Sequence, residues 1–189
     1  MHSEGVMTMF VFKFDKAIQA AAYLLRREPS REMNYMRLLK ILYIADRESI
    51  KLTGRPITGD RVIAMKQGPV LSNILDLIKG IHLRSPEWSM FIQRDEYKIR
   101  LIAETGLPNL SRFDILTLER VAEEHRSLDE WDLVEFTHNF PEWRKNDPGD
   151  SKMKKIPFPD IFEALGRTAD PEIEEEAMED RAFARLFGN

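Results

Sequence analysis

Residues 38–79 read LLKILYIADRESIKLTGRPITGDRVIAMKQGPVLSNILDLIK, and this stretch decides the fold class. Its first part is predicted to be a helix because apolar residues recur every three or four positions. The stripe consists of Leu38, Ile41, Leu42 and Ala45, with Leu39 and Ile44 beside it. An apolar surface this wide is typical of a helix that is buried on more than one side. We therefore expect residues 38–45 to form the central buried helix, which Gly54 and Pro56 then end.

The second part of the stretch predicts a change from helix to strand and back. Apolar residues alternate over 61–66, which favours a short strand that ends at Gly68. Pro69 suits the first turn of a helix because its missing N–H would have no partner there. Apolar spacing continues this helix to Gly80. The residues expected to make the structural turns are Gly54, Pro56, Gly59, Gly68 and Pro69.

Regions on both sides of this stretch add a helix and a hairpin. Helical spacing starts at Asp15, a candidate N-cap, and stops at Pro29. Residues 88–94 and 97–104 alternate well enough to form a hairpin. Together with the strand at 61–66, this hairpin predicts a small antiparallel sheet.

A helical pair and a surface loop follow. Apolar spacing predicts helices over 111–126 and 127–140, and Ser127 with Glu130 forms a capping-box pattern at the start of the second. Polar residues then predict a surface loop, which leads to a short helix at 158–166.

These elements predict one compact domain of the α+β class, predominantly helical, with a small antiparallel β-sheet of about three short strands. Its expected bounds are 14–166, with an N-terminal extension at 1–13 and an acidic amphipathic tail at 167–189. The tail is expected either to dock as a helix or to extend from the domain. Its apolar side chains are Ile173, Ala177, Phe183, Leu186 and Phe187.

Composition argues against several classes of function. The 189 residues include 28 Lys and Arg against 32 Asp and Glu, and this net charge of -4 argues against broad nucleic-acid binding. Disulfides, thiolate catalysis and cysteine-based zinc sites are excluded because the chain has no cysteine. The histidines at 2, 82, 125 and 138 lack metal-ligand spacing, so we expect no metal and no cofactor. No signal peptide or membrane span is recognisable, which favours a cytoplasmic protein without a membrane partner.

Polar side chains on the helix over 38–53 are the first candidates for a functional site. Asp46 and Arg47 either hydrogen-bond the backbone around Gly59 and Gly68 or contact a partner. Tyr43 lies near them, and Tyr and Arg are residue types enriched at interface hot spots.

Catalysis finds less support in the sequence. No nucleophile, base and orienting group stand in a recognisable pattern, so we expect no catalytic residue. The turn KQGPVLS at 66–72 lacks the Lys-Ser/Thr pair of a phosphate loop, which favours a structural turn over a phosphate site. The alternative to a binding protein is a hydrolase or nucleotide-binding enzyme that uses Asp46, Asp60 and His138.

The stretch 38–79 also resembles the signature region of the Panacea domain, the SocA-like family of bacterial and phage-associated antitoxins. The matching residues are Lys40, Leu42, Tyr43, Ala45, Gly54, Arg55, Pro56, Gly68, Pro69 and Val70. A second landmark of the family, a Thr-His pair followed by an aromatic-containing loop, is matched by Thr137, His138 and Trp143. Together these landmarks cover most of residues 14–166.

The resemblance implies a mostly helical domain with a small sheet that neutralises a toxin by direct protein contact. One member of the family is known as an adaptor that delivers its toxin to a protease, so the implied partners are a cognate toxin and a cellular protease. No DNA-binding domain is evident in front of the signature region, which sets this chain apart from many relatives. The residues expected to bind the partner, or to support the contact surface, are Tyr43, Asp46, Arg47, Arg55, His138 and Trp143.

Overall fold

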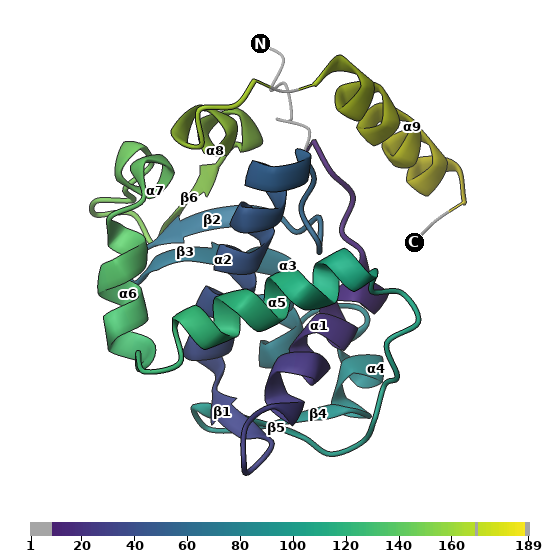
Figure 1. Cartoon of the computed structure of the whole chain (residues 1–189), viewed down its shortest axis with the longest axis vertical. Helices are drawn as coiled ribbons and strands as arrows, with labels where there is room; N and C mark the ends of the chain where they lie inside the picture. The colour runs from purple at the N-terminus through teal and green to yellow at the C-terminus, as the bar shows by residue number, and fades with distance from the viewer. Residues whose placement is uncertain (1–8, 169, 188–189) are drawn as a thin grey trace.

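The computed structural model describes residues 9–168 and 170–187, and the long helix α2 (Tyr35–Thr53) lies at its centre (Figure 1). Asn34 caps the start of α2, where its side chain accepts a hydrogen bond from the backbone N–H of Met36 at 2.8 Å. Gly54 ends the helix in the left-handed conformation, with φ of 78°, and donates its N–H to the carbonyl of Ile50. The predicted central helix and its glycine end are confirmed.

Eight further helices occur in the part of the chain that the structure describes. They are α1 (Phe14–Arg26), α3 (Ser72–Lys79), α4 (Ser85–Ser89), α5 (Arg112–Glu124), α6 (Glu130–His138), α7 (Pro141–Lys145), α8 (Phe158–Ala164) and α9 (Pro171–Phe187). Helices α1, α5 and α6 pack against α2, and α1 also contacts α5 (Figure 1). None of the helices within the described ranges is long and apolar enough to cross a membrane.

The described strands form two three-stranded antiparallel sheets rather than one. The first has the order β1 (Glu32–Asn34), β5 (Lys98–Leu101), β4 (Ile92–Asp95). The second has the order β3 (Gly68–Leu71), β2 (Val62–Met65), β6 (Met153–Ile156). The predicted α+β class and the β4–β5 hairpin are confirmed. Strand β2 was expected beside that hairpin, but it pairs instead with β3 and β6.

The prediction for Pro69 was wrong, because this residue lies in β3 and not in the first turn of a helix. Lys66 and Gln67 form a two-residue loop between paired Met65 and Gly68, so the chain turns back as a hairpin before α3 begins at Ser72. Strand β3 is an edge strand, where proline is tolerated because one row of backbone groups has no ladder partner.

Two predicted helix starts are also corrected. Helix α1 begins at Phe14 with Lys13, and not Asp15, at the N-cap position, and the backbone N–H of Lys13 donates to the carbonyl of Thr58 at 2.8 Å. The capping box of α6 is formed by Asp129 and Asp132, whose side chains accept from each other's backbone N–H. At α6, an acidic pair that also fits the capping-box pattern takes the place of Ser127 and Glu130.

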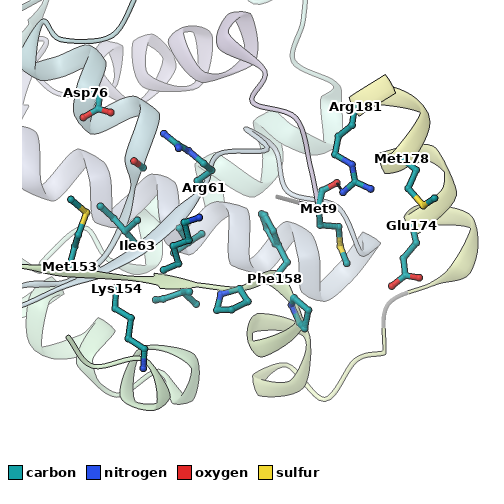
Figure 2. A pocket seen from close by; sticks show the side chains of 16 residues that line it. Met9, Arg61, Ile63, Asp76, Met153, Lys154, Phe158, Glu174, Met178 and Arg181 are labelled. Carbon is teal, nitrogen blue, oxygen red and sulfur yellow. Dashed lines mark hydrogen bonds between the residues drawn. The ribbon is translucent and has the colours of Figure 1, made fainter. Parts of the chain in front are cut away.

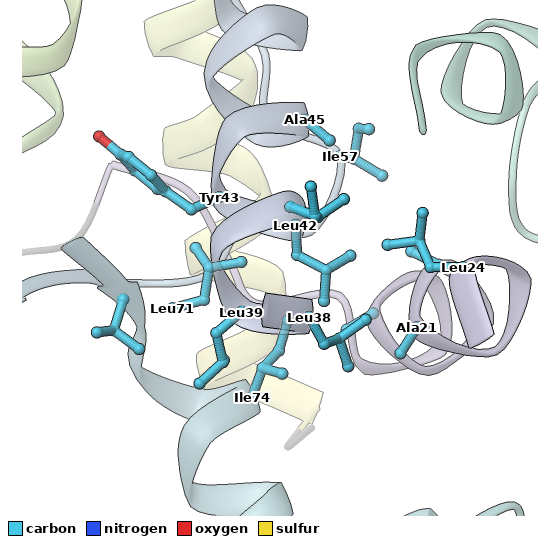
Figure 3. Close-up of a cluster of buried hydrophobic side chains, with 14 of the residues drawn as sticks. Ala21, Leu24, Leu38, Leu39, Leu42, Tyr43, Ala45, Ile57, Leu71 and Ile74 are labelled. Carbon is cyan, nitrogen blue, oxygen red and sulfur yellow. The ribbon is translucent and has the colours of Figure 1, made fainter. Parts of the chain in front are cut away.

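The core gathers around α2, and Figure 3 shows Leu38 and Leu42 beside Leu24 and Ala21 of α1. Leu71 and Ile74 approach the same helix from the second sheet and α3. Tyr43 points its hydroxyl away from this apolar cluster (Figure 3). The core therefore leaves one side of α2 for polar contacts.

The tail forms helix α9 over residues 171–187. Ile173 and Ala177 are buried, whereas Phe183 and Leu186 are mostly exposed. The expected apolar contacts thus come from the first half of α9; the side chain of Phe187 lies outside the described residues. Residues 1–8 of the predicted N-terminal extension also lie outside them, and the division into extension, domain and tail stays a prediction.

Candidate functional site

Asp46 fastens the loop that follows α2. Its Oδ1 accepts hydrogen bonds from the backbone N–H groups of Ile57 and Thr58, both at 2.9 Å, and its Oδ2 accepts one from the Thr58 hydroxyl. The side chain is 3% exposed. Burial raises the pKa of Asp46 to about 7, while the hydrogen bonds from Thr58 and Ile57 act in the opposite direction. The expected bond between Asp46 and the backbone near Gly59 is present.

Asp60 holds the start of α3 through hydrogen bonds to backbone N–H groups, as Asp46 holds the loop after α2. It accepts hydrogen bonds from the backbone N–H groups of Asn73 and Ile74 at 2.9 Å, and from the Asn73 side-chain amide at 2.7 Å. Burial raises its pKa to about 6, and the side chain is 0% exposed. The anion-binding position at the start of α3 is therefore filled by a carboxylate of the chain itself.

Glu142 of α7 joins Tyr43 and Arg47, which lie one turn apart on α2. The Tyr43 hydroxyl and Nε of Arg47 both donate to Oε1 of Glu142 at 2.7 Å. The Arg47 guanidinium also lies 4.2 Å from the centroid of the Phe140 ring. Burial, with the Glu142 carboxylate second, raises the pKa of Tyr43 well above its usual value. This glutamate cluster (Tyr43, Arg47, Phe140, Glu142) connects α2 to the α6–α7 turn.

Lys40 connects the same face of α2 to the hairpin. Its ammonium is 1% exposed and donates to the carbonyl of Pro69 at 2.9 Å. Burial lowers the pKa of Lys40 to about 7. A Cβ atom at Gly68, where φ is 95°, would lie 2.7 Å from Oγ1 of Thr137 and 2.8 Å from Nζ of Lys40. The hairpin therefore approaches α2 and α6 so closely that a side chain at position 68 would force Lys40 or Thr137 to move.

His138 and Trp143 hold the hairpin loop from the other side. Their rings stack with centroids 4.0 Å apart and an interplanar angle of 18°. Nε2 of His138 lies 3.1 Å from the carbonyl oxygen of Lys66, and Nε1 of Trp143 donates to the carbonyl of Met65 at 3.2 Å. Burial and the nearby Lys40 ammonium lower the pKa of His138. Both rings are half-buried, so this aromatic clamp (His138, Trp143) remains partly accessible.

Arg55 lies elsewhere, at the start of the loop after α2. Its Nε donates to Glu176 of α9 at 3.1 Å, so it connects the domain to the tail. Gly54 and Gly59 are also constrained there. A Cβ atom added at Gly54 would lie 2.5 Å from Cδ1 of Ile173, and one added at Gly59 would lie 2.1 Å from the carbonyl oxygen of Val11. The structure thus brings Tyr43, Arg47, His138 and Trp143 together around the α6–α7 turn, and places Asp46 and Arg55 at the loop over 54–60.

Sequence reasoning missed three features of the site. It did not identify Glu142, it did not predict that Lys40 bonds the hairpin, and it did not predict that Asp60 caps α3. Tyr43 and Arg47, four residues apart on one helix face, signalled the need for an acceptor, but nothing local identified Glu142. Arg47 was expected near Gly59 or Gly68 and pairs with Glu142 instead. No group of three or more His, Asp or Glu residues that could hold a metal ion occurs within residues 9–168 and 170–187.

Comparison with known proteins gives one result. A family model described as "Antitoxin SocA-like, Panacea domain" matches residues 38–144, which is more than half of the chain. The matched range contains the glutamate cluster, Lys40 with Gly68, and the aromatic clamp. Comparisons with curated proteins and with solved structures found no match.

Proposed function

The chain belongs to the SocA-like antitoxin family of Panacea-domain proteins, and on this premise we propose that it neutralises a cognate toxin by direct protein–protein binding. The observation that carries the proposal is the position of the match, which begins at Leu38 and ends one residue after Trp143. The contacts that hold the hairpin against α2, α6 and α7 therefore lie within the family's own region.

The six residues selected from the sequence fall into two groups by their burial and contacts: those that support the contact surface and those that contact the partner directly. Tyr43 and Asp46 are buried and already bonded, so we assign them to support of the contact surface. Arg47 supports it through Glu142. His138 and Trp143 are half-buried and Arg55 is exposed at its ion pair, so these three are the proposed direct contacts.

A catalytic role for Asp46, Asp60 and His138 finds less support. Both carboxylates are almost fully buried, and their oxygens are occupied by N–H and O–H donors of the chain. A general base or nucleophile must reach its substrate within hydrogen-bonding distance. These two side chains would have to release the loop over 54–60 or the start of α3 to do so.

The experiment looks in the neighbouring reading frame for a growth-arresting protein and titrates that protein with the purified chain. Inhibition that saturates at a fixed molar ratio is expected, because binding is stoichiometric; protection by trace amounts would contradict it. Trp143→Ala should weaken toxin binding by about 2 kcal/mol or more if it is a hot spot. The matched control is Trp131→Ala, since Trp131 is exposed on α6 and has no part in the clamp. Circular dichroism must show that both variants fold.

The adaptor form of this function adds a protease to the complex. The second half of α9 supports it, because Leu186 there is an apolar side chain that is 77% exposed and could contact a second protein. An adaptor shortens the half-life of the toxin in cells, whereas simple binding does not.

A further inference from the structure

A groove of about 710 Å³ lies beside the second sheet, and neither residue of the aromatic clamp lines it. Figure 2 shows Ile63 and Met153 from the sheet, Phe158 from α8, and Met9 and Met178 around it. Three methionines line this groove (Met9, Met153, Met178), and the unbranched thioether side chain adapts to partners of different shape. The volume falls in the range of sites that bind ligands or peptide side chains.

The charge of the groove is opposite to that of the chain. Four cationic side chains line it, Arg61, Lys154, Lys155 and Arg181, against the acids Asp76 and Glu174. The chain as a whole has a net charge of -4. Lys154 and Lys155 are exposed and make no ion pair within the described residues. The groove therefore favours a partner that is both apolar and acidic.

Strand β6 forms one edge of the sheet and borders the groove. On the opposite edge, β3 is covered by α6, whereas β6 has a strand on one side only in the described part of the chain. Its residues Met153, Lys154 and Lys155 are exposed. Lysines on an open edge ordinarily prevent uncontrolled strand pairing. Here they also leave the edge open to a strand whose charge is complementary.

The register shows which backbone groups point outward. The N–H of Ser72 donates to the carbonyl of Arg61 at 2.9 Å, so alternate residues of β2 from Arg61 onward bond to β3. Val62 and Ala64 must then bond to their partners Ile156 and Lys154 in β6. The backbone N–H and C=O groups of Met153 and Lys155 therefore point away from the sheet.

We propose that this edge and groove bind an extended segment of a partner protein, with alternating acidic and apolar side chains, which adds a fourth strand beside β6. Main-chain hydrogen bonds to Met153 and Lys155 hold the segment, and the methionine-lined groove receives its apolar side chains. If the partner is the toxin, that identification rests on the proposed function, whereas the binding of an extended acidic and apolar segment does not.

The first test uses a fluorescein-labelled hexapeptide of sequence DVEIDV with the full-length protein, followed by fluorescence anisotropy. Binding should weaken with added salt. Lys155→Pro removes an outward N–H and blocks the added strand, so Kd should rise by about tenfold or more. The matched control Lys155→Ala removes the charged side chain but keeps the backbone N–H, and Kd should rise by about twofold. Each variant is checked by its melting temperature.

Charge reversal provides a second arm in case the proline variant does not fold. Lys155→Glu should weaken DVEIDV binding and strengthen binding of the peptide KVKIKV. Three results would overturn the proposal. They are no binding of DVEIDV to the wild-type protein, equal binding of DVEIDV by the wild type and Lys155→Pro, and equal affinity of the wild type for DVEIDV and KVKIKV. Displacement of DVEIDV by a single-stranded thymidine 20-mer would also overturn it, because the cations would then recognise phosphate. The peptide assay contains no toxin, so its failure would leave the proposed function standing.

Discussion

Replacement of Gly68 by alanine is the sharpest test of the packing between the hairpin and α2. Gly80, at the end of α3, provides a matched control, because φ is 95° at Gly68 and 76° at Gly80. Both positions lie in the left-handed region, where alanine is strained by about 1 kcal/mol. The surroundings differ, since an added Cβ at Gly80 meets nothing within 4 Å.

At Gly68 the collision adds to the backbone strain. The new methyl group would lie under 3 Å from both the Lys40 ammonium and the Thr137 hydroxyl. The ammonium donates to Pro69, and the hydroxyl bonds carbonyls of Leu133 and Val134. Loss or distortion of one such buried hydrogen bond costs about 1–3 kcal/mol. Gly68→Ala should therefore destabilise the fold by about 2–4 kcal/mol, against about 1 kcal/mol for Gly80→Ala.

Urea unfolding followed by circular dichroism measures the difference. With an m-value of about 2 kcal/mol/M, the midpoint of Gly68→Ala should lie about 1 M below that of Gly80→Ala. Thr137→Ala makes room for the methyl group, so the double variant should cost less than the sum of the two single variants. Equal midpoints for the two glycine variants would refute the close approach of the hairpin to α2.

Three further predictions concern buried charge. The pKa of Lys40 is lowered from 10.5 to about 7, so between these pH values the unfolded chain binds one more proton than the folded chain. The free energy of unfolding, relative to that of Lys40→Met, should therefore rise from pH 7 to pH 10. A difference that stays constant over this range would contradict the prediction. The pKa of Asp46 is raised from 3.8 to about 7, so between these pH values the folded chain binds one more proton than the unfolded chain. In the same unfolding assay, stability relative to Asp46→Asn should therefore fall from pH 4 to pH 7. A stability difference that does not change with pH would count against burial as the cause. Glu142→Gln should cost about 3 kcal/mol in urea unfolding because it leaves Arg47 poorly paired, whereas Glu163→Gln, in an exposed pair with Lys145, should change stability by less than about 0.5 kcal/mol.

Local patterns were sufficient for most of the helices and for one hairpin, but they did not predict the five-residue helices α4 and α7. The apolar stripe from Leu38 to Ala45 predicted α2, and alternation on both sides of residues 95 and 96 predicted β4 and β5. Strand β3 was missed because Gly68 and Pro69 are poor strand formers, and pairing with β2 overrides that preference. Strand β6 was missed because its polar, lysine-rich sequence reads as a loop until β2 provides the ladder.

The site was only partly predictable because its contacts are long-range. Tyr43 and Arg47 were recognised as unusual on an apolar helix, but Glu142 is distant in sequence and lies in a five-residue helix without periodicity. The sequence does not identify an acceptor for Lys40, because the Pro69 carbonyl that receives its hydrogen bond is 29 residues away. Residue type identified the donors, and the tertiary fold provided the acceptors.

The placement of the motif residues also bears on where a partner is chosen. Lys40, Tyr43, Gly68 and Thr137 carry the family resemblance, and each is packed against the chain's own backbone or side chains. Residues used in this way specify a scaffold, because a side chain that is already bonded and buried contributes little new contact area to a partner. The groove residues Met153, Lys155 and Met178 lie outside the matched range of 38–144 and are exposed. Because these four buried motif residues build the scaffold, substitutions at Tyr43 should change whether the chain folds, whereas substitutions at Lys155 should change only the binding of the segment that adds beside β6.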